Sequence, residues 1–161
     1  MSAISGTNRR QQGIAAVEFA IISVLMLMIA GGVVEFGRAF WYLDALTKAT
    51  RDAARYLSES DLASGNIDQA KQMVASSVNA AGIGSNDFTT ANVAVNCLNI
   101  SFTTMGCPVN AGDPEPEYVK VGIVGVTQVI GKWIPILLPS KEATTFSAPF
   151  SPSTIMRYMK G

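Results

Sequence analysis

Residues 14–34 read IAAVEFAIISVLMLMIAGGVV, and this stretch decides the fold because it is 21 residues long and almost entirely apolar. It contains one charged residue, Glu18, and one hydroxyl residue, Ser23. A helix of this length rises about 30 Å, which matches the hydrocarbon thickness of a bilayer. The stretch therefore predicts a membrane-spanning helix over residues 14–35.

A cleaved secretory signal and a buried core helix are the alternatives to a retained span. A secretory signal has an apolar region of about 7–15 residues that ends at a small-residue cleavage site. Here Ala30-Gly31-Gly32 leads directly into further helical pattern. A core helix of a soluble domain usually carries a polar stripe, and this run has none. Both alternatives are weaker than the span.

The helical pattern continues beyond the apolar run. Two pairs of opposite charge, Asp44 with Lys48 and Arg55 with Glu59, have the i,i+4 spacing that stabilises an exposed helix surface. Apolar or small residues recur at three- and four-residue spacing at Phe36, Phe40, Leu43, Leu46, Thr50, Ala53 and Leu57. Residues 36–60 are thus expected to extend the same helix as an amphipathic stem.

The remainder of the chain changes from helical to strand periodicity. Residues 66–82 predict a second helix with Asn66 as its N-cap. Residues 86–161 are β-rich, with short alternating runs at 93–95, 98–102, 118–129 and 144–150. The predicted fold class is α+β, in which the long helix and the second helix pack on one face of a small antiparallel, pilin-like sheet.

The composition excludes several kinds of function. The 161 residues contain 12 Lys+Arg, 12 Asp+Glu and no histidine. A balanced charge argues against nucleic acid as a partner, and the lack of imidazole excludes histidine-based catalysis and histidine-ligated metals. We expect no enzyme, no cofactor and no metal site, although paired-carboxylate and Ser-Lys chemistry stay open at this point.

The two cysteines, Cys97 and Cys107, enclose nine residues between candidate strands. In an oxidising compartment they are expected to form a disulfide, and in a reducing one they are free thiols. Arg9 and Arg10 favour a cytoplasmic N-terminus, but Arg38 lies close to the other end of the span. The disulfide prediction favours a periplasmic position for the residues after the span.

Two loops offer further candidate sites. Residues 130–139 read IGKWIPILLP, and Trp133, Ile136 and Leu138 either fold back into the core or form a contact patch for a partner or the membrane surface. Asp113, Glu115 and Glu117 alternate with prolines. This acidic segment is expected to be a rigid solvated loop, with cation binding as the alternative.

The junction before the apolar run carries the most specific signal. Residues 1–13 form a polar, basic leader that ends at Gly13, and Glu18 stands five residues further on. A carboxylate in a membrane helix costs up to roughly 2.5–3.5 kcal/mol at the helix centre and less near an end. Glu18 therefore either has a partner or reaches the membrane surface from its own helix end.

At this junction the sequence resembles the type IV pilin superfamily, and in particular the TadE-like minor pilins of the tight-adherence (Flp) pilus system. The resemblance is carried by three stretches: Gly13 followed by Ile14-Ala15-Ala16-Val17-Glu18-Phe19-Ala20, the helix through Phe36-Gly37-Arg38 and Asp52-Ala53-Ala54-Arg55, and Ser153-Thr154-Ile155-Met156-Arg157-Tyr158. It covers most of the chain, but only the first stretch is close. Phe19 stands where related pilins often have tyrosine.

The resemblance implies that a membrane prepilin peptidase cuts between Gly13 and Ile14, so that the apolar helix is kept and the leader is lost. The new α-amino group of Ile14 would lie about 6 Å from Glu18 along the helix axis. Glu18 could neutralise the amine of its own chain or that of a neighbouring subunit. Ala16 and Ala20 form a small-xxx-small pair that permits close helix packing.

The first functional hypothesis is therefore a minor pilin or pseudopilin that takes part in pilus assembly. Its expected partners are the prepilin peptidase, other major and minor pilins, the assembly platform and the membrane. Its expected location is the inner membrane as a single-pass protein, with a cytoplasmic N-terminus and a periplasmic C-terminal domain, and with possible incorporation into a surface pilus. The alternative is a permanently anchored periplasmic scaffold or binding protein that is never processed.

Overall fold

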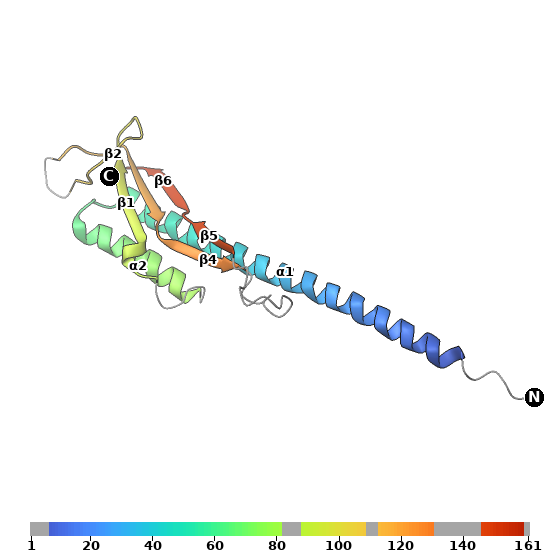
Figure 1. Cartoon of the computed structure of the whole chain (residues 1–161). Coiled ribbons are helices and arrows are strands. Elements are labelled where there is room, and N and C mark those ends of the chain that lie inside the picture. Colours follow the sequence, from blue (N-terminus) through green and yellow to red (C-terminus); the bar gives the residue numbers. More distant parts are fainter. Residues whose placement is uncertain (1–6, 82–87, 109–112, 131–145, 160–161) are drawn as a thin grey trace, which may run out of the picture. The chain divides into compact units, whose positions relative to one another are not determined.

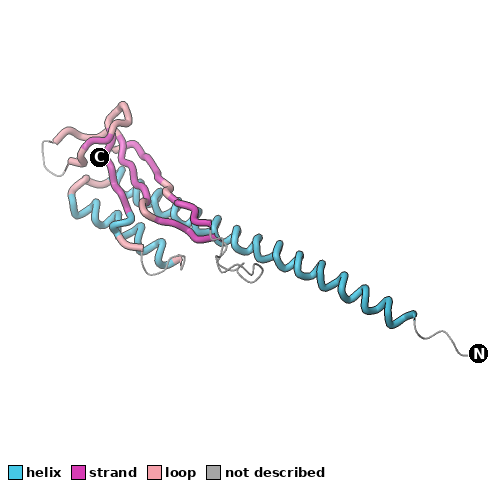
Figure 2. Tube along the Cα trace, viewed as in Figure 1, coloured by secondary structure: helices cyan, strands magenta, loops and turns pink. Residues whose placement is uncertain are grey.

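The structure is a computed structural model that describes residues 7–81, 88–108, 113–130 and 146–159. The chain divides into two units, Met1–Arg38 with Ile130–Phe146, and Ala39–Val129 with Ser147–Gly161. Figures 1 and 2 show the elements. The fold is α+β, as predicted, with one long helix, a second helix and a small antiparallel sheet.

The long helix α1 spans Thr7–Glu59 without a break, 53 residues in all. It begins seven residues before Ile14 and so includes the second half of the predicted leader. The predicted surface ion pairs are present, with 2.7 Å between Lys48 Nζ and Asp44 Oδ2 and 3.5 Å between Arg55 Nε and Glu59 Oε1. Both pairs are exposed, so each contributes little to stability.

The second helix, α2, spans Ser64–Ala80 and begins two residues before the predicted start. The prediction of Asn66 as N-cap is wrong, because Ala63 occupies that position and no side chain caps the helix end. The Asn66 amide instead donates a 2.8 Å hydrogen bond to the Asp61 carbonyl, and its Oδ1 accepts one from the Tyr56 hydroxyl at 3.3 Å. Asn66 thereby ties the connecting turn to α1.

The main sheet has four antiparallel strands in the order β2-β1-β3-β6. In β3, Val119 lies opposite Cys97 of β1 on one side and opposite Met156 of β6 on the other. A separate pair joins β4 and β5, and a short 3₁₀ turn, η1, leads into β1. The bounds are η1 Thr90–Asn92, β1 Val93–Leu98, β2 Thr104–Met105, β3 Tyr118–Ile123, β4 Val126–Ile130, β5 Phe146–Phe150 and β6 Ser153–Arg157.

Two of the predicted strand runs differ from the structure. Leu98 is the last residue of β1, and residues 99–102 do not form a strand, because the Asn99 side chain accepts hydrogen bonds from the backbone amides of Ser101 and Thr103 and closes a turn. Such a turn is a common alternative to strand pairing for asparagine. The run 118–129 is split into β3 and β4 at Gly125, whose φ of 71° lies in the left-handed region that favours glycine.

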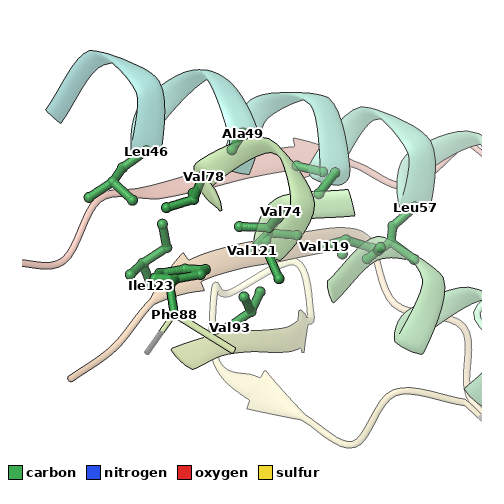
Figure 3. Packing of buried hydrophobic residues seen from close by; sticks show 14 of the residues in the cluster. Leu46, Ala49, Leu57, Val74, Val78, Phe88, Val93, Val119, Val121 and Ile123 are labelled. Carbon is green, nitrogen blue, oxygen red and sulfur yellow. The ribbon is translucent and has the colours of Figure 1, made fainter. Parts of the chain in front are cut away.

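The core lies between the helices and one face of the main sheet (Figure 3). Leu46 and Leu57 of α1, Val74 and Val78 of α2, and Val121 of β3 are fully buried there. Phe36 and Phe40, which share the helical spacing of the apolar positions of the stem, are 61% and 60% exposed. The buried face begins instead with Ala39 and Tyr42.

Candidate assembly site on the N-terminal helix

The predicted cleavage and assembly residues all lie on α1. Gly13, Ile14, Val17, Glu18 and Ile21 share one side of the helix, as their three- and four-residue spacing requires. Ile14 and Ile21 are each 68% exposed, and Glu18 is exposed among them. The carboxylate therefore belongs to an apolar strip of the helix surface and lies one turn above Ile14.

The glycine at position 13 has no close packing neighbour among the described residues. A Cβ atom built there would meet nothing within 4 Å apart from the helix's own backbone and its chain neighbours. An alanine would also favour the helix by about 1 kcal/mol. Gly31, Gly32 and Gly37 of the same helix are likewise open to a Cβ atom.

Phe19, Ala16 and Ala20 form the neighbouring part of the helix surface. Phe19 is 73% exposed, and both alanines are exposed. The small side chains leave the backbone of α1 open to close approach by another helix. The Ser23 hydroxyl donates a 2.8 Å hydrogen bond to the Phe19 carbonyl, so this polar group is satisfied within the helix.

One helix among the described residues is long and apolar enough to cross a membrane. It lies near the N-terminus, its most apolar 18-residue window has a mean hydropathy of 2.4, and none of that window is buried. A helix that leaves so apolar a surface uncovered differs from the core helix of a soluble domain. The helix fits a single-pass membrane anchor.

The cysteine prediction is confirmed, because Cys97 and Cys107 form a disulfide with a Cα–Cα distance of 5.0 Å. The bond joins β1 to the segment that follows β2, and Cys97 itself is fully buried. It therefore anchors the β1–β2 end of the sheet to the core.

The acidic segment that precedes β3 contributes an ion pair that the sequence reasoning missed. Glu117 Oε1 lies 2.9 Å from Arg157 Nη2 of β6. The two residues are 40 positions apart, so spacing along the chain gave no sign of the contact. The described part of the chain holds no group of three potential metal ligands. Trp133, Ile136 and Leu138 lie outside the described residues.

The aromatic residues that follow the span were also missed as candidate site residues. Trp41 is 62% exposed, whereas Tyr42 is 4% exposed, with its ring centroid 6.0 Å from that of Phe150. The available signal was three consecutive aromatic residues, 40–42, just beyond a predicted membrane span. Aromatic residues are enriched at the membrane–water interface.

The long apolar helix, the second helix and the small antiparallel sheet give an α+β fold that is consistent with a pilin-like protein. Residues 13–55 match the family model described as TadE-like protein. The match begins at Gly13 and ends within the stem, so the resemblance to TadE-like pilins is confirmed over this part of α1. No curated protein matches the chain, and no solved structure does. The matched segment covers the apolar run and most of the stem, and the β-rich part of the chain lies outside it.

Proposed function

We propose that this protein is a minor pilin or pseudopilin of a tight-adherence (Flp) pilus or a related secretion system. A prepilin peptidase cuts it after Gly13, and the mature chain stays in the inner membrane until it takes part in pilus assembly with other pilins and the assembly platform. The family match over residues 13–55 supports this assignment. The size of the domain after residue 39 favours a minor component over an abundant shaft subunit.

The observation that carries the proposal is the position of Glu18. It is the only charged residue between Ile14 and Val34, and it lies on the same side of α1 as Ile14. Cleavage creates a positive amine on Ile14, about 6 Å from Glu18 along the axis. Each group alone is costly in the membrane, and together they neutralise each other. A pair formed between neighbouring subunits would also fix their axial register.

The start of α1 at Thr7 bears on how cleavage takes place. The bond between Gly13 and Ile14 lies within the helix of the uncut chain. A peptidase requires an extended substrate, so the first turns must open locally before the cut. Glycine lowers the cost of that opening relative to alanine by about 1 kcal/mol.

The disulfide supports the proposed orientation. Bonds such as Cys97–Cys107 persist in oxidising compartments and are rare in the cytosol. The disulfide supports a periplasmic location for the residues after the span, and Arg9 and Arg10 favour a cytoplasmic leader. The peptidase would then act at the cytoplasmic end of the span.

The test replaces Glu18 with glutamine, which keeps the shape and removes the charge. Cells with the peptidase and the pilus system should still produce a membrane-inserted chain whose mass shows Ile14 as first residue. Its amount in sheared fibres should fall by at least about tenfold, the effect of losing roughly 1.4 kcal/mol. Glu18→Asp, which keeps the charge, should retain part of the incorporation.

Ser23→Ala is the matched control, because Ser23 is the other polar residue of the stretch 14–34 and its hydroxyl donates a hydrogen bond to the Phe19 carbonyl of the same helix. It should assemble normally. Normal incorporation of Glu18→Gln would show that the charge pair has no role in assembly. A mature N-terminus at Met1 or Ser2 in the presence of the peptidase would favour a permanently anchored protein.

A further inference from the structure

Trp41 presents a large exposed apolar surface on the outer part of α1. The side chain is 62% exposed, and its neighbour Tyr42 points to the other side of the helix, where it packs near Phe150. A tryptophan side chain buries about 150–250 Å² when it is covered, so leaving it in water forgoes a substantial hydrophobic gain. The position of Trp41 along α1 indicates what covers it.

Trp41 lies seven residues beyond Val34, the last residue of the apolar run. Its Cα is therefore about 10 Å beyond the end of the run along the axis. Side chains of a helix lean toward its N-terminus and cover the preceding turn, which brings the indole about 5 Å lower. The headgroup layer of a bilayer extends roughly 5–7 Å beyond the hydrocarbon on each side.

We propose that Trp41 docks into the phospholipid headgroup layer at the outer end of the span. Arg38 lies one turn below on the same side of α1, where its exposed guanidinium can meet lipid phosphates. Indole rings favour this layer because one edge is apolar and the N–H can donate a hydrogen bond. The site sets how far α1 protrudes from the membrane.

This inference rests on the membrane-spanning helix and not on cleavage or pilus assembly. Glu18 sits near one end of the apolar run and Trp41 just beyond the other, 23 positions apart. A carboxyl side chain is costly at the centre of the hydrocarbon, which keeps Glu18 near the membrane boundary, and the indole of Trp41 favours the opposite interface. The two residues together hold the axial position of α1 before any subunit contact forms.

The experiment measures the depth of single tryptophan residues in the full-length chain. Trp133→Phe leaves Trp41 as the sole tryptophan, which is excited selectively at wavelengths that the four tyrosines do not absorb. The protein is reconstituted into vesicles of phosphatidylcholine and phosphatidylglycerol whose acyl chains carry bromine either next to the glycerol or near the bilayer centre. Trp41 should emit at a shorter wavelength than indole in water, and the shallow bromines should quench it roughly twice as strongly as the deep ones.

Two reference chains calibrate the depth, both built on Trp41→Phe with Trp133→Phe. Lys48→Trp places the fluorophore two turns farther out on the same side and should escape both quenchers. Leu25→Trp places it within the apolar run and should be quenched more by the deep bromines. If the deep bromines quench a tryptophan at position 25 but neither bromolipid quenches Trp41, the membrane-spanning helix is supported and the interfacial site is overturned.

Other results also overturn the proposal. Trp41 protected from aqueous acrylamide but not quenched by either bromolipid would mean that protein covers the ring, from its own chain or from a second copy. Stronger quenching of Trp41 by deep bromines would place the ring inside the hydrocarbon. A lack of quenching at both positions 25 and 41 would remove the span and the interfacial site together, whatever the outcome of the cleavage test.

Discussion

Residues 14–34 and residues 39–58 belong to the same helix, yet they bury very different surfaces. In the first segment Ile14, Phe19 and Leu27 are 68–73% exposed, whereas in the second Leu46, Ala53 and Leu57 are 0% exposed. The first segment is apolar on all sides, and the second alternates buried and charged positions. The comparison shows that the backbone conformation is common to both, while the distribution of side chains decides whether the rest of the domain covers the helix or leaves it exposed.

The largest expected effect comes from removing a side chain of the buried segment. Leu57→Ala leaves a cavity in the core between α1, α2 and the sheet. The free energy of unfolding of the domain should fall by about 2–5 kcal/mol. Urea denaturation of the detergent-solubilised chain, followed by near-ultraviolet circular dichroism, measures it.

Leu25→Ala makes the same chemical change in the exposed segment, where the side chain is 58% exposed. It should change the unfolding of the domain by less than about 0.5 kcal/mol. The substitution should instead weaken membrane insertion, to which one leucine contributes roughly 0.3–0.6 kcal/mol. Similar losses of domain stability in Leu57→Ala and Leu25→Ala would show that the two segments do not differ in how strongly they stabilise the domain.

The sequence predicted the features that depend on composition and local period. The span, the charge pairs of the stem, the α+β class and the cysteine pair all follow from residue type or short spacing. Helical period alone aligned Phe36 and Phe40 with the apolar positions of the stem, but in the structure the buried face starts with Ala39 and Tyr42. The helical period defines the buried face of α1 only approximately. The shape of the domain that packs on the helix decides which side chains belong to that face.

Long-range contacts could not be predicted from a single sequence. The hydroxyls of Thr50 and Thr154 lie 3.1 Å apart across 104 positions, and Glu117 meets Arg157 across 40. Nothing near these residues in the chain indicates their partners. The geometry of the candidate site, by contrast, could be predicted from the sequence. Gly13, Ile14 and Glu18 lie within two helical turns, so their spacing along the chain determines their positions on the helix.

The disulfide provides a smaller effect that is confined to the domain with the buried segment. Cys97→Ala with Cys107→Ala removes the cross-link and should lower the free energy of unfolding by about 2–3 kcal/mol. Cys107→Ala alone keeps the buried Cys97 side chain and should lose nearly as much, because the cross-link and not the packing is removed. Thermal melting of the three proteins measures the differences.

Membrane insertion of these cysteine variants should match that of the unmodified chain, since the apolar run is unchanged. Partition between membrane and soluble fractions provides the check. A melting temperature that does not respond to a reductant would show that the Cys97–Cys107 bond adds no stability. A loss of insertion would show that the span depends on the folded domain.

The smallest expected effect concerns Tyr42, at the start of the buried segment. Burial raises the pKa of its phenol above the usual 10.0 because the charged form is poorly solvated there. The unfolded chain then releases this proton at a lower pH than the folded one. The stability from the neutral phenol is therefore complete below pH 10.0 and is lost as the pH rises through the folded-state pKa.

Tyr42→Phe tests this prediction, because phenylalanine keeps the ring near Phe150 and removes the titrating group. At neutral pH its stability should lie within about 0.5 kcal/mol of the unmodified chain. Above pH 10.0 it should become the more stable of the two, since it lacks the Tyr42 contribution to alkaline unfolding. Comparing the two proteins at each pH cancels the titration of all other groups. Parallel losses of stability would mean that Tyr42 is solvated, and the buried face of α1 would then begin closer to Leu46.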